Sequence, residues 1–248
     1  MKYEIMAEIP KTLEQAIAQA QGATQAAIAD GYSLLQIEIL IPELNPMPVA
    51  EQFLPALDSF GNQLKVFFPD AGAAALARRD WGSVPFKILD IGTGRVPVDQ
   101  QVLPEDEAFL LVAPSAVEVA QVEKLHQAVG ERPFILLNPR LEDVSIVGIG
   151  YAGRQLRARF LNTIESCYHL RPLDGAAVFR CYPSPWQVWQ ENKDGEYQLI
   201  AEQPKKPMGD EVDSILSGNS PQQVSNSVQA KKPGIFASMQ RFLRTLSR

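Results

Sequence analysis

Short apolar runs alternate with amphipathic segments over most of the chain. Apolar residues recur at three- and four-residue steps in residues 11–30, which predicts a helix that ends before Gly31. Residues 34–41 predict a strand that ends at Pro42, and apolar runs bounded by turn residues predict further strands at 63–68, 86–91, 108–112 and 134–137. Helical patterns lie between these runs at 48–60, 70–77 and 117–129, and Asp70 is expected to cap the second of them. Such alternation predicts an α/β fold, with a mostly parallel sheet between two helical layers in a Rossmann-like three-layer architecture.

The pattern changes in the later part of the chain. Residues 155–168 predict a long helix, and residues 177–181, 187–190 and 197–201 predict short strands. Between the last two strands, Asn192 to Gly195 form a typical hairpin signal. We therefore expect the sheet to gain an antiparallel hairpin at one edge.

The composition shifts again after residue 201. Residues 203–230 are rich in Pro, Ser, Gln and Asn, and only Asp210 to Leu216 have helical character. Such a segment buries too little apolar surface to order itself. The sequence thus predicts an α/β domain at 1–201, a flexible linker at 202–230 and a separate tail at 231–248.

The charge distribution sets the tail apart from the domain. The chain has 248 residues, 46% of them hydrophobic, and a formal net charge of -6. This size suits one sizeable core, and the acidic balance argues against nucleic acid as a partner. Residues 231–248 nevertheless contain five basic residues and no acidic one. A basic tail on an acidic body indicates that the two parts have different tasks.

The tail has the pattern of an amphipathic helix. Its apolar stripe consists of Ile235, Phe236, Met239, Phe242, Leu243 and Leu246, and Arg241 and Arg244 lie on the other side. So short a helix is marginal alone in water, so it should fold on contact with an anionic membrane surface or a partner. Packing back onto its own domain is the alternative. No apolar run reaches the length of about 20 residues that spans a bilayer, so membrane contact would be peripheral.

A glycine-rich motif is the main candidate for ligand chemistry. Gly148, Gly150 and Gly153 match the pattern G-x-G-x-x-G, and Arg154 follows. Such glycines let a dinucleotide phosphate approach a helix N-terminus, which would make the protein a nucleotide-binding enzyme or sensor. The acidic residue that should hold the ribose is not at the end of a following strand, since Asp174 precedes the strand at 177–181. A plain glycine turn entering a helix is the other interpretation.

The remaining reactive residues form no recognisable site. The two histidines, His126 and His169, lack metal-ligand spacing, and Cys167 and Cys181 are expected to be reduced thiols. No P-loop motif is present. We therefore predict no metal, no cofactor and no catalytic residue, which leaves enzymatic activity undecided but disfavoured.

Several segments resemble a family of cyanobacterial and plastid proteins, the domain of unknown function numbered nineteen ninety-five, which includes the plant Low PSII Accumulation three protein. They are 10–31, 68–77, 111–114, 137–139, 150–161, 168–173 and 180–186, within a resemblance over about residues 8–200. The resemblance implies a non-enzymatic assembly or regulatory factor for photosystem II biogenesis. It also implies a cytoplasmic protein at the thylakoid membrane, with a membrane-protein client such as a photosystem II subunit. The basic tail lies outside the resemblance, so its membrane role rests on its amphipathic pattern.

Overall fold

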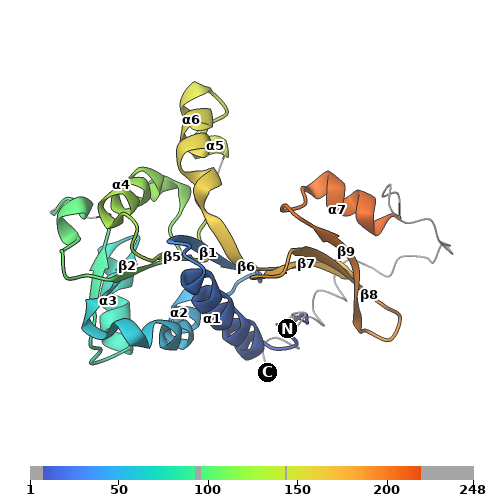
Figure 1. Cartoon of the computed structure of the whole chain (residues 1–248), viewed down its shortest axis with the longest axis horizontal. Coiled ribbons are helices and arrows are strands. Elements are labelled where there is room, and N and C mark those ends of the chain that lie inside the picture. The colour runs from blue at the N-terminus through green and yellow to red at the C-terminus, as the bar shows by residue number, and fades with distance from the viewer. Residues whose placement is uncertain (1–7, 93–95, 143, 219–248) are drawn as a thin grey trace.

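A nine-stranded mixed sheet organises the residues that the computed structural model describes, 8–92, 96–142 and 144–218 (Figure 1). The strand order is β3-β2-β4-β5-β1-β6-β7-β8-β9. The strands are β1 Leu34–Ile39, β2 Leu64–Phe68, β3 Lys87–Asp90, β4 Ala108–Val112, β5 Phe134–Leu137, β6 Glu165–Leu173, β7 Ala176–Cys181, β8 Trp186–Glu191 and β9 Tyr197–Gln203. Strands β3 to β6 in this order are parallel, and β6 to β9 pair antiparallel. The mostly parallel α/β sheet with an antiparallel edge is therefore confirmed.

Helices cover both faces of the parallel half. The helices are α1 Leu13–Ala29, α2 Pro46–Phe53, α3 Ala71–Asp80, α4 Val119–Val129, α5 Val144–Val147, α6 Tyr151–Arg159 and α7 Gly209–Leu216. Short 3₁₀ helices occupy Leu54–Gln63, Val98–Gln101, Ala116–Glu118 and Leu161–Thr163. One face packs against α1, α2 and α3, and the other packs against α4 and the segment that follows α6. This arrangement places apolar residues on both sides of β2, β4 and β5, as their continuous apolar runs require.

Local sequence signals set the helix starts. Thr12, Asn45 and Asp70 each accept a hydrogen bond from a backbone N–H in the first turn of α1, α2 and α3. The Asp70 cap was expected from the sequence, because short polar side chains satisfy the free N–H groups at a helix N-terminus. The helix expected at 48–60 becomes α2 followed by a 3₁₀ segment, and Pro55 lies at the start of that segment.

The long helix predicted at 155–168 is wrong. Helix α6 ends at Arg159, and β6 begins at Glu165. Strand β6 pairs with β1 on one side and β7 on the other, so tertiary hydrogen bonding overrides the local helical pattern. Residues 166–170 are buried within the sheet.

The antiparallel half extends beyond the boundary predicted at residue 201. Strand β9 ends at Gln203, and α7 packs Val212 against Val178 and Trp186 on the sheet. Residues 202–218 therefore belong to the fold. The predicted turn is present, with the Asn192 side chain accepting from the Asp194 and Glu196 N–H groups.

The predicted docking tail cannot be placed in this fold. All of its site residues, from Ile235 to Leu246, lie outside the described residues. Within the described ranges, no helix has both the length and the apolarity needed to cross a bilayer.

Candidate functional site: a polar pocket and a projecting arm

A pocket opens where the connections of two neighbouring parallel strands diverge. After β1, the chain passes through α2 on one face of the sheet and reaches β2. After β5, it passes through the α5–α6 region toward the other face and reaches β6. Strands β1 and β5 are adjacent, so their following loops separate at the carboxyl edge. Such divergence points are where open α/β sheets bind ligands.

Two residues in the left-handed conformation hold the strand ends next to this pocket. Ala113 follows β4 with φ 50°, and Asn138 follows β5 with φ 49°. The Asn138 N–H donates to the Ile37 carbonyl at 2.7 Å, and its side-chain oxygen accepts from the Ile39 N–H at 2.7 Å. Asn138 thus fixes the loop after β5 to β1. Left-handed backbone is costly for Ala113, so the surrounding hydrogen bonds must hold it there.

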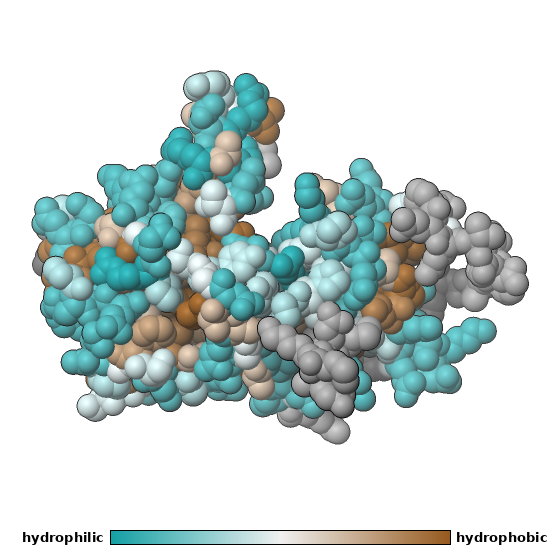
Figure 2. All heavy atoms as spheres, in the orientation of Figure 1, coloured by the Kyte–Doolittle hydropathy of each residue, from teal (hydrophilic) through white to brown (hydrophobic). Residues whose placement is uncertain are grey.

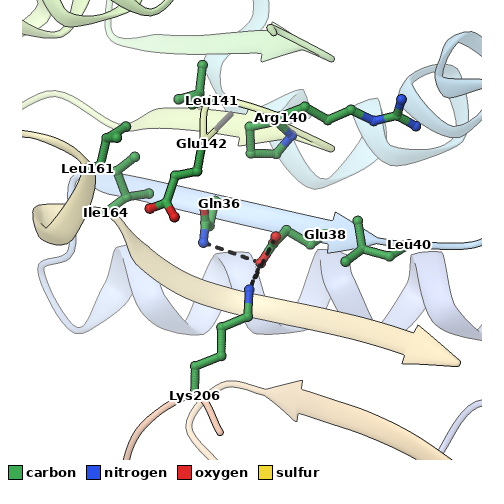
Figure 3. A pocket seen from close by; sticks show the side chains of 10 residues that line it. Gln36, Glu38, Leu40, Arg140, Leu141, Glu142, Leu161, Ile164 and Lys206 are labelled. Atoms are coloured by element: carbon green, nitrogen blue, oxygen red, sulfur yellow. Dashed lines mark hydrogen bonds and ion pairs between the residues drawn. The ribbon is translucent and has the colours of Figure 1, made fainter. Parts of the chain in front are cut away.

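The pocket has a volume of about 550 Å³ and a mixed lining (Figure 3). Polar groups come from β1, the loop after β5 and the segment between β9 and α7, and aliphatic side chains complete the wall. The lining residues are Gln36, Glu38, Leu40, Pro139, Arg140, Leu141, Glu142, Leu161, Ile164 and Lys206.

Glu38 is the centre of the charge network in the pocket. Its carboxylate lies 2.7 Å from Nδ1 of His169 and 3.2 Å from Nζ of Lys206, and it accepts from the Gln36 amide at 3.3 Å. His169 is fully buried on β6, whereas Lys206 is about half-exposed. The ring of Trp186 lies 5.0 Å from the His169 ring and 5.5 Å from Lys206 Nζ. The β1 carboxylate is therefore held by groups from three separate parts of the chain.

Glu38 and His169 differ in charge, because different effects dominate their pKa values. Burial favours the neutral form of Glu38, but the hydrogen bond from His169 and the charge of Lys206 outweigh it and lower the pKa. Burial lowers the pKa of His169 more than the Glu38 carboxylate raises it. At neutral pH, His169 is thus a neutral imidazole that donates its Nδ1 hydrogen to an ionised Glu38.

Unpartnered polar atoms gather next to the pocket. Among the described residues, five buried side-chain atoms lack a hydrogen-bond partner, and three of them are Ser166 Oγ, His169 Nε2 and Arg180 Nε. These three lie on β6 and β7, and Ser166 and His169 are in register with Gln36 and Glu38 of β1. Buried polar groups without partners are rare, so these three atoms make the region a candidate for ligand binding.

Sequence reasoning missed every polar member of this pocket. A signal was present in β1, where Gln36 and Glu38 alternate with Leu35, Ile37 and Ile39 and so mark one polar face of a buried strand. Nothing local indicated His169, which follows the helix predicted at 155–168, or Lys206, which was assigned to the linker. Their contribution depends on strand pairings between distant residues.

The glycine-rich motif lies in a different place, on an arm that α5 and α6 extend from the body (Figure 1). Residues 144–147 form a helix, so the strand that the dinucleotide fingerprint requires before its glycines is replaced by α5. Gly153 packs against the turn, because an added Cβ would lie 2.3 Å from the Gly148 carbonyl oxygen. The Arg154 and Arg157 guanidinium groups donate to the carbonyls of Ile149 and Gly148. The polar groups of the turn are therefore used within the arm.

The arm exposes three large apolar side chains and contains no acidic residue. Ile149 is 74% exposed and Tyr151 73%, the highest values for large hydrophobic residues in the described ranges, and Ile146 is 52% exposed. Figure 2 shows hydrophobic patches on the arm among hydrophilic side chains. Residues 144–164 contain three arginines and no acidic residue, although the chain as a whole is acidic. Arg159 forms an ion pair with Glu123 of α4, so Arg154 and Arg157 supply the positive charge near the exposed apolar side chains.

Residues 10–214 match the model of the family described as Domain of unknown function (DUF1995), and the chain belongs to this family. The matched range includes the whole pocket, the arm and most of α7. The family resemblance seen in the sequence is thus confirmed, and it extends past the expected end of the domain.

Proposed function

We propose that this protein is a non-enzymatic assembly or regulatory factor that works at the anionic surface of a membrane, which it contacts through the α5–α6 arm. The observation that carries the proposal is the exposure of Ile149 and Tyr151 on an acid-free projection. Exposed apolar side chains next to arginines are typical of surfaces that insert into the headgroup region of a bilayer. A tyrosine suits that boundary, because its ring is apolar and its hydroxyl is polar.

The energetics favour two weak contacts over one. Burial of one large aliphatic side chain contributes about 2 kcal/mol, and each basic residue near an anionic surface contributes about 1 kcal/mol. The arm alone would therefore bind reversibly. The amphipathic tail predicted at 231–248 would supply the second contact, and tethering two weak contacts to one surface raises their combined affinity.

Flotation with anionic phosphatidylglycerol vesicles tests the role of the arm. The variant with Ile149→Ser and Tyr151→Ser should bind with a constant at least about tenfold weaker than the unchanged protein, since about 1.4 kcal/mol corresponds to a factor of ten. Leu76→Ser is the matched control, because Leu76 is 46% exposed and lies on α3, which packs on the opposite face of the sheet. Equal flotation of the double variant and the control would mean that the arm does not contribute to membrane binding.

A chain ending at residue 230 separates the tail from the arm. We expect this truncated chain to float less than the full chain, and the loss should add to that of the arm variant. Equal flotation of the full and truncated chains would leave the tail without a membrane role.

The family resemblance supports a more specific proposal. The membrane would be the cytoplasmic face of the thylakoid, and the client would be a membrane protein such as a photosystem II subunit. Affinity purification from detergent-solubilised thylakoids tests this assignment. Recovery of photosystem II subunits with the unchanged protein, and their loss with the arm variant, is the expected result. Recovery that is equal with both proteins would place the client contact elsewhere.

A further inference from the structure

We propose that the pocket between β1 and the loop after β5 binds an alkylammonium group, carried either by a free diamine or by a lysine side chain of a polypeptide. The carboxylates of Glu38 and Glu142 would receive the ammonium group, and the aliphatic wall would receive its stem. This proposal is independent of the membrane role of the arm, because it rests on different residues.

An ammonium group of the chain itself already shows what the pocket recognises. Lys206 Nζ lies 3.2 and 3.5 Å from the two oxygens of Glu38, and 5.5 Å from the centre of the Trp186 ring. A carboxylate beside the face of an indole ring is the typical environment in which proteins hold organic cations. Lys206 is about half-exposed and lies on the connection between β9 and α7. It can therefore move aside without disturbing a buried strand.

The rest of the lining favours a cation over an anion. In Figure 3, Glu142 points from the loop after β5 toward Gln36, on the same side as the Glu38 carboxylate, whereas Arg140 extends away from both. Glu38 is buried and ionised, because His169 and Lys206 lower its pKa. An anionic ligand would have to approach these two carboxylates.

The same lining favours an alkyl cation over a metal ion. Leu141, Leu161 and Ile164 contribute an aliphatic wall next to the carboxylates. In the part of the chain that the structure describes, no group of three metal-ligating side chains converges. Hard divalent cations need more oxygen ligands than two carboxylates supply, whereas an ammonium group on a methylene stem matches both parts of the surface.

Calorimetric titration of the full chain with 1,5-diaminopentane tests the proposal. Removal of the internal competitor in Lys206→Met should tighten binding about tenfold or more, in line with competition for one carboxylate. Addition of Glu142→Gln to this variant should weaken binding by a similar factor. Lys205→Met is the matched control and should leave the affinity unchanged, because Lys205 is exposed next to Lys206 but does not line the pocket.

Two further probes test where the ammonium group comes from and whether its positive charge is required. Lysine capped at both ends represents a polypeptide side chain, and glutarate represents an anion of similar length. Binding of the diamine or of the capped lysine to Lys206→Met supports the proposal and identifies the source. The proposal is overturned if neither amine binds a Lys206→Met protein whose melting temperature is unchanged, or if glutarate binds in their place. Vesicle binding tests the membrane role of the arm separately. Failure of that role would leave these calorimetric titrations unaffected.

Discussion

The pocket and the arm share the connection between β5 and β6 but use their polar groups in opposite ways. In the pocket, Glu38 and His169 are buried and bind each other, so charge is part of the fold. On the arm, Arg154 and Arg157 satisfy the turn carbonyls, and the apolar side chains of Ile149 and Tyr151 face outward. Changes in the pocket should therefore affect stability first, whereas changes on the arm surface should affect binding first.

The largest effect on stability is expected from Glu38→Gln. The change keeps the size of the side chain but removes the negative charge. That charge pairs with Lys206 and strengthens the hydrogen bond from His169. Hydrogen bonds to charged groups contribute about 1.5–3 kcal/mol, so we expect the free energy of unfolding to fall by about 2 kcal/mol. Urea denaturation measures this loss.

A matched change in the same pocket controls for the position. Glu142 is exposed, so Glu142→Gln should change the free energy of unfolding by less than about 0.5 kcal/mol. Equal losses in the two variants would contradict the distinction between a structural and an accessible carboxylate.

A smaller global effect is expected from Gly153→Ala on the arm. The new Cβ would lie 2.3 Å from the Gly148 oxygen and 2.6 Å from the Val147 oxygen, so α6 and the turn must separate. The arm projects from the body, so it can open locally while the sheet stays folded. Global stability should fall by about 1 kcal/mol or less, and amide exchange should accelerate in residues 147–156.

Gly150→Ala is the control for this prediction. Gly150 is the N-cap of the same helix, but an added Cβ there would have no heavy atom within 4 Å. Faster exchange in both variants would mean that the arm is loose for reasons other than the Gly153 contact.

The sequence predicted much of the sheet because buried parallel strands have a local signal. The predicted strand at 108–112 coincides with β4, and Asp70 caps α3 as expected. The same reasoning failed for β6, since its mixed residues Glu165 to Leu173 become a strand only through pairing with β1 and β7. The sequence failed to predict the pocket for the same reason. Glu38 and His169 are 131 residues apart, and Lys206 reaches Glu38 over 168 residues, so only the tertiary fold brings them together.

The pH dependence of stability tests whether the charge network of Glu38 and His169 stabilises the fold. The pKa of His169 is lowered in the fold below its ordinary 6.5, so the unfolded chain binds the proton first as the pH falls. The pKa of Glu38 is lowered below 4.5, which adds a loss in the same direction at lower pH. Stability should therefore fall from about pH 7 to about pH 5, as measured by urea denaturation across this range.

His126 has to be separated from this effect. Burial also lowers the pKa of His126, which lies on α4 against the rings of Phe134 and Phe160. His126→Gln should therefore reduce the slope of stability against pH only in part. A flat profile in this variant would assign the whole dependence to His126 and none to the pocket.

The smallest effect on stability belongs to the arm surface, and it completes the comparison. Ile149→Ser with Tyr151→Ser removes two side chains that are almost three-quarters exposed, so the free energy of unfolding should stay within about 0.5 kcal/mol of the unchanged protein. The same variant should lose vesicle binding. A loss of stability as large as that of Glu38→Gln would mean that the arm surface packs within the fold. We propose that these exposed apolar groups serve binding, and this variant measures folding and vesicle binding separately.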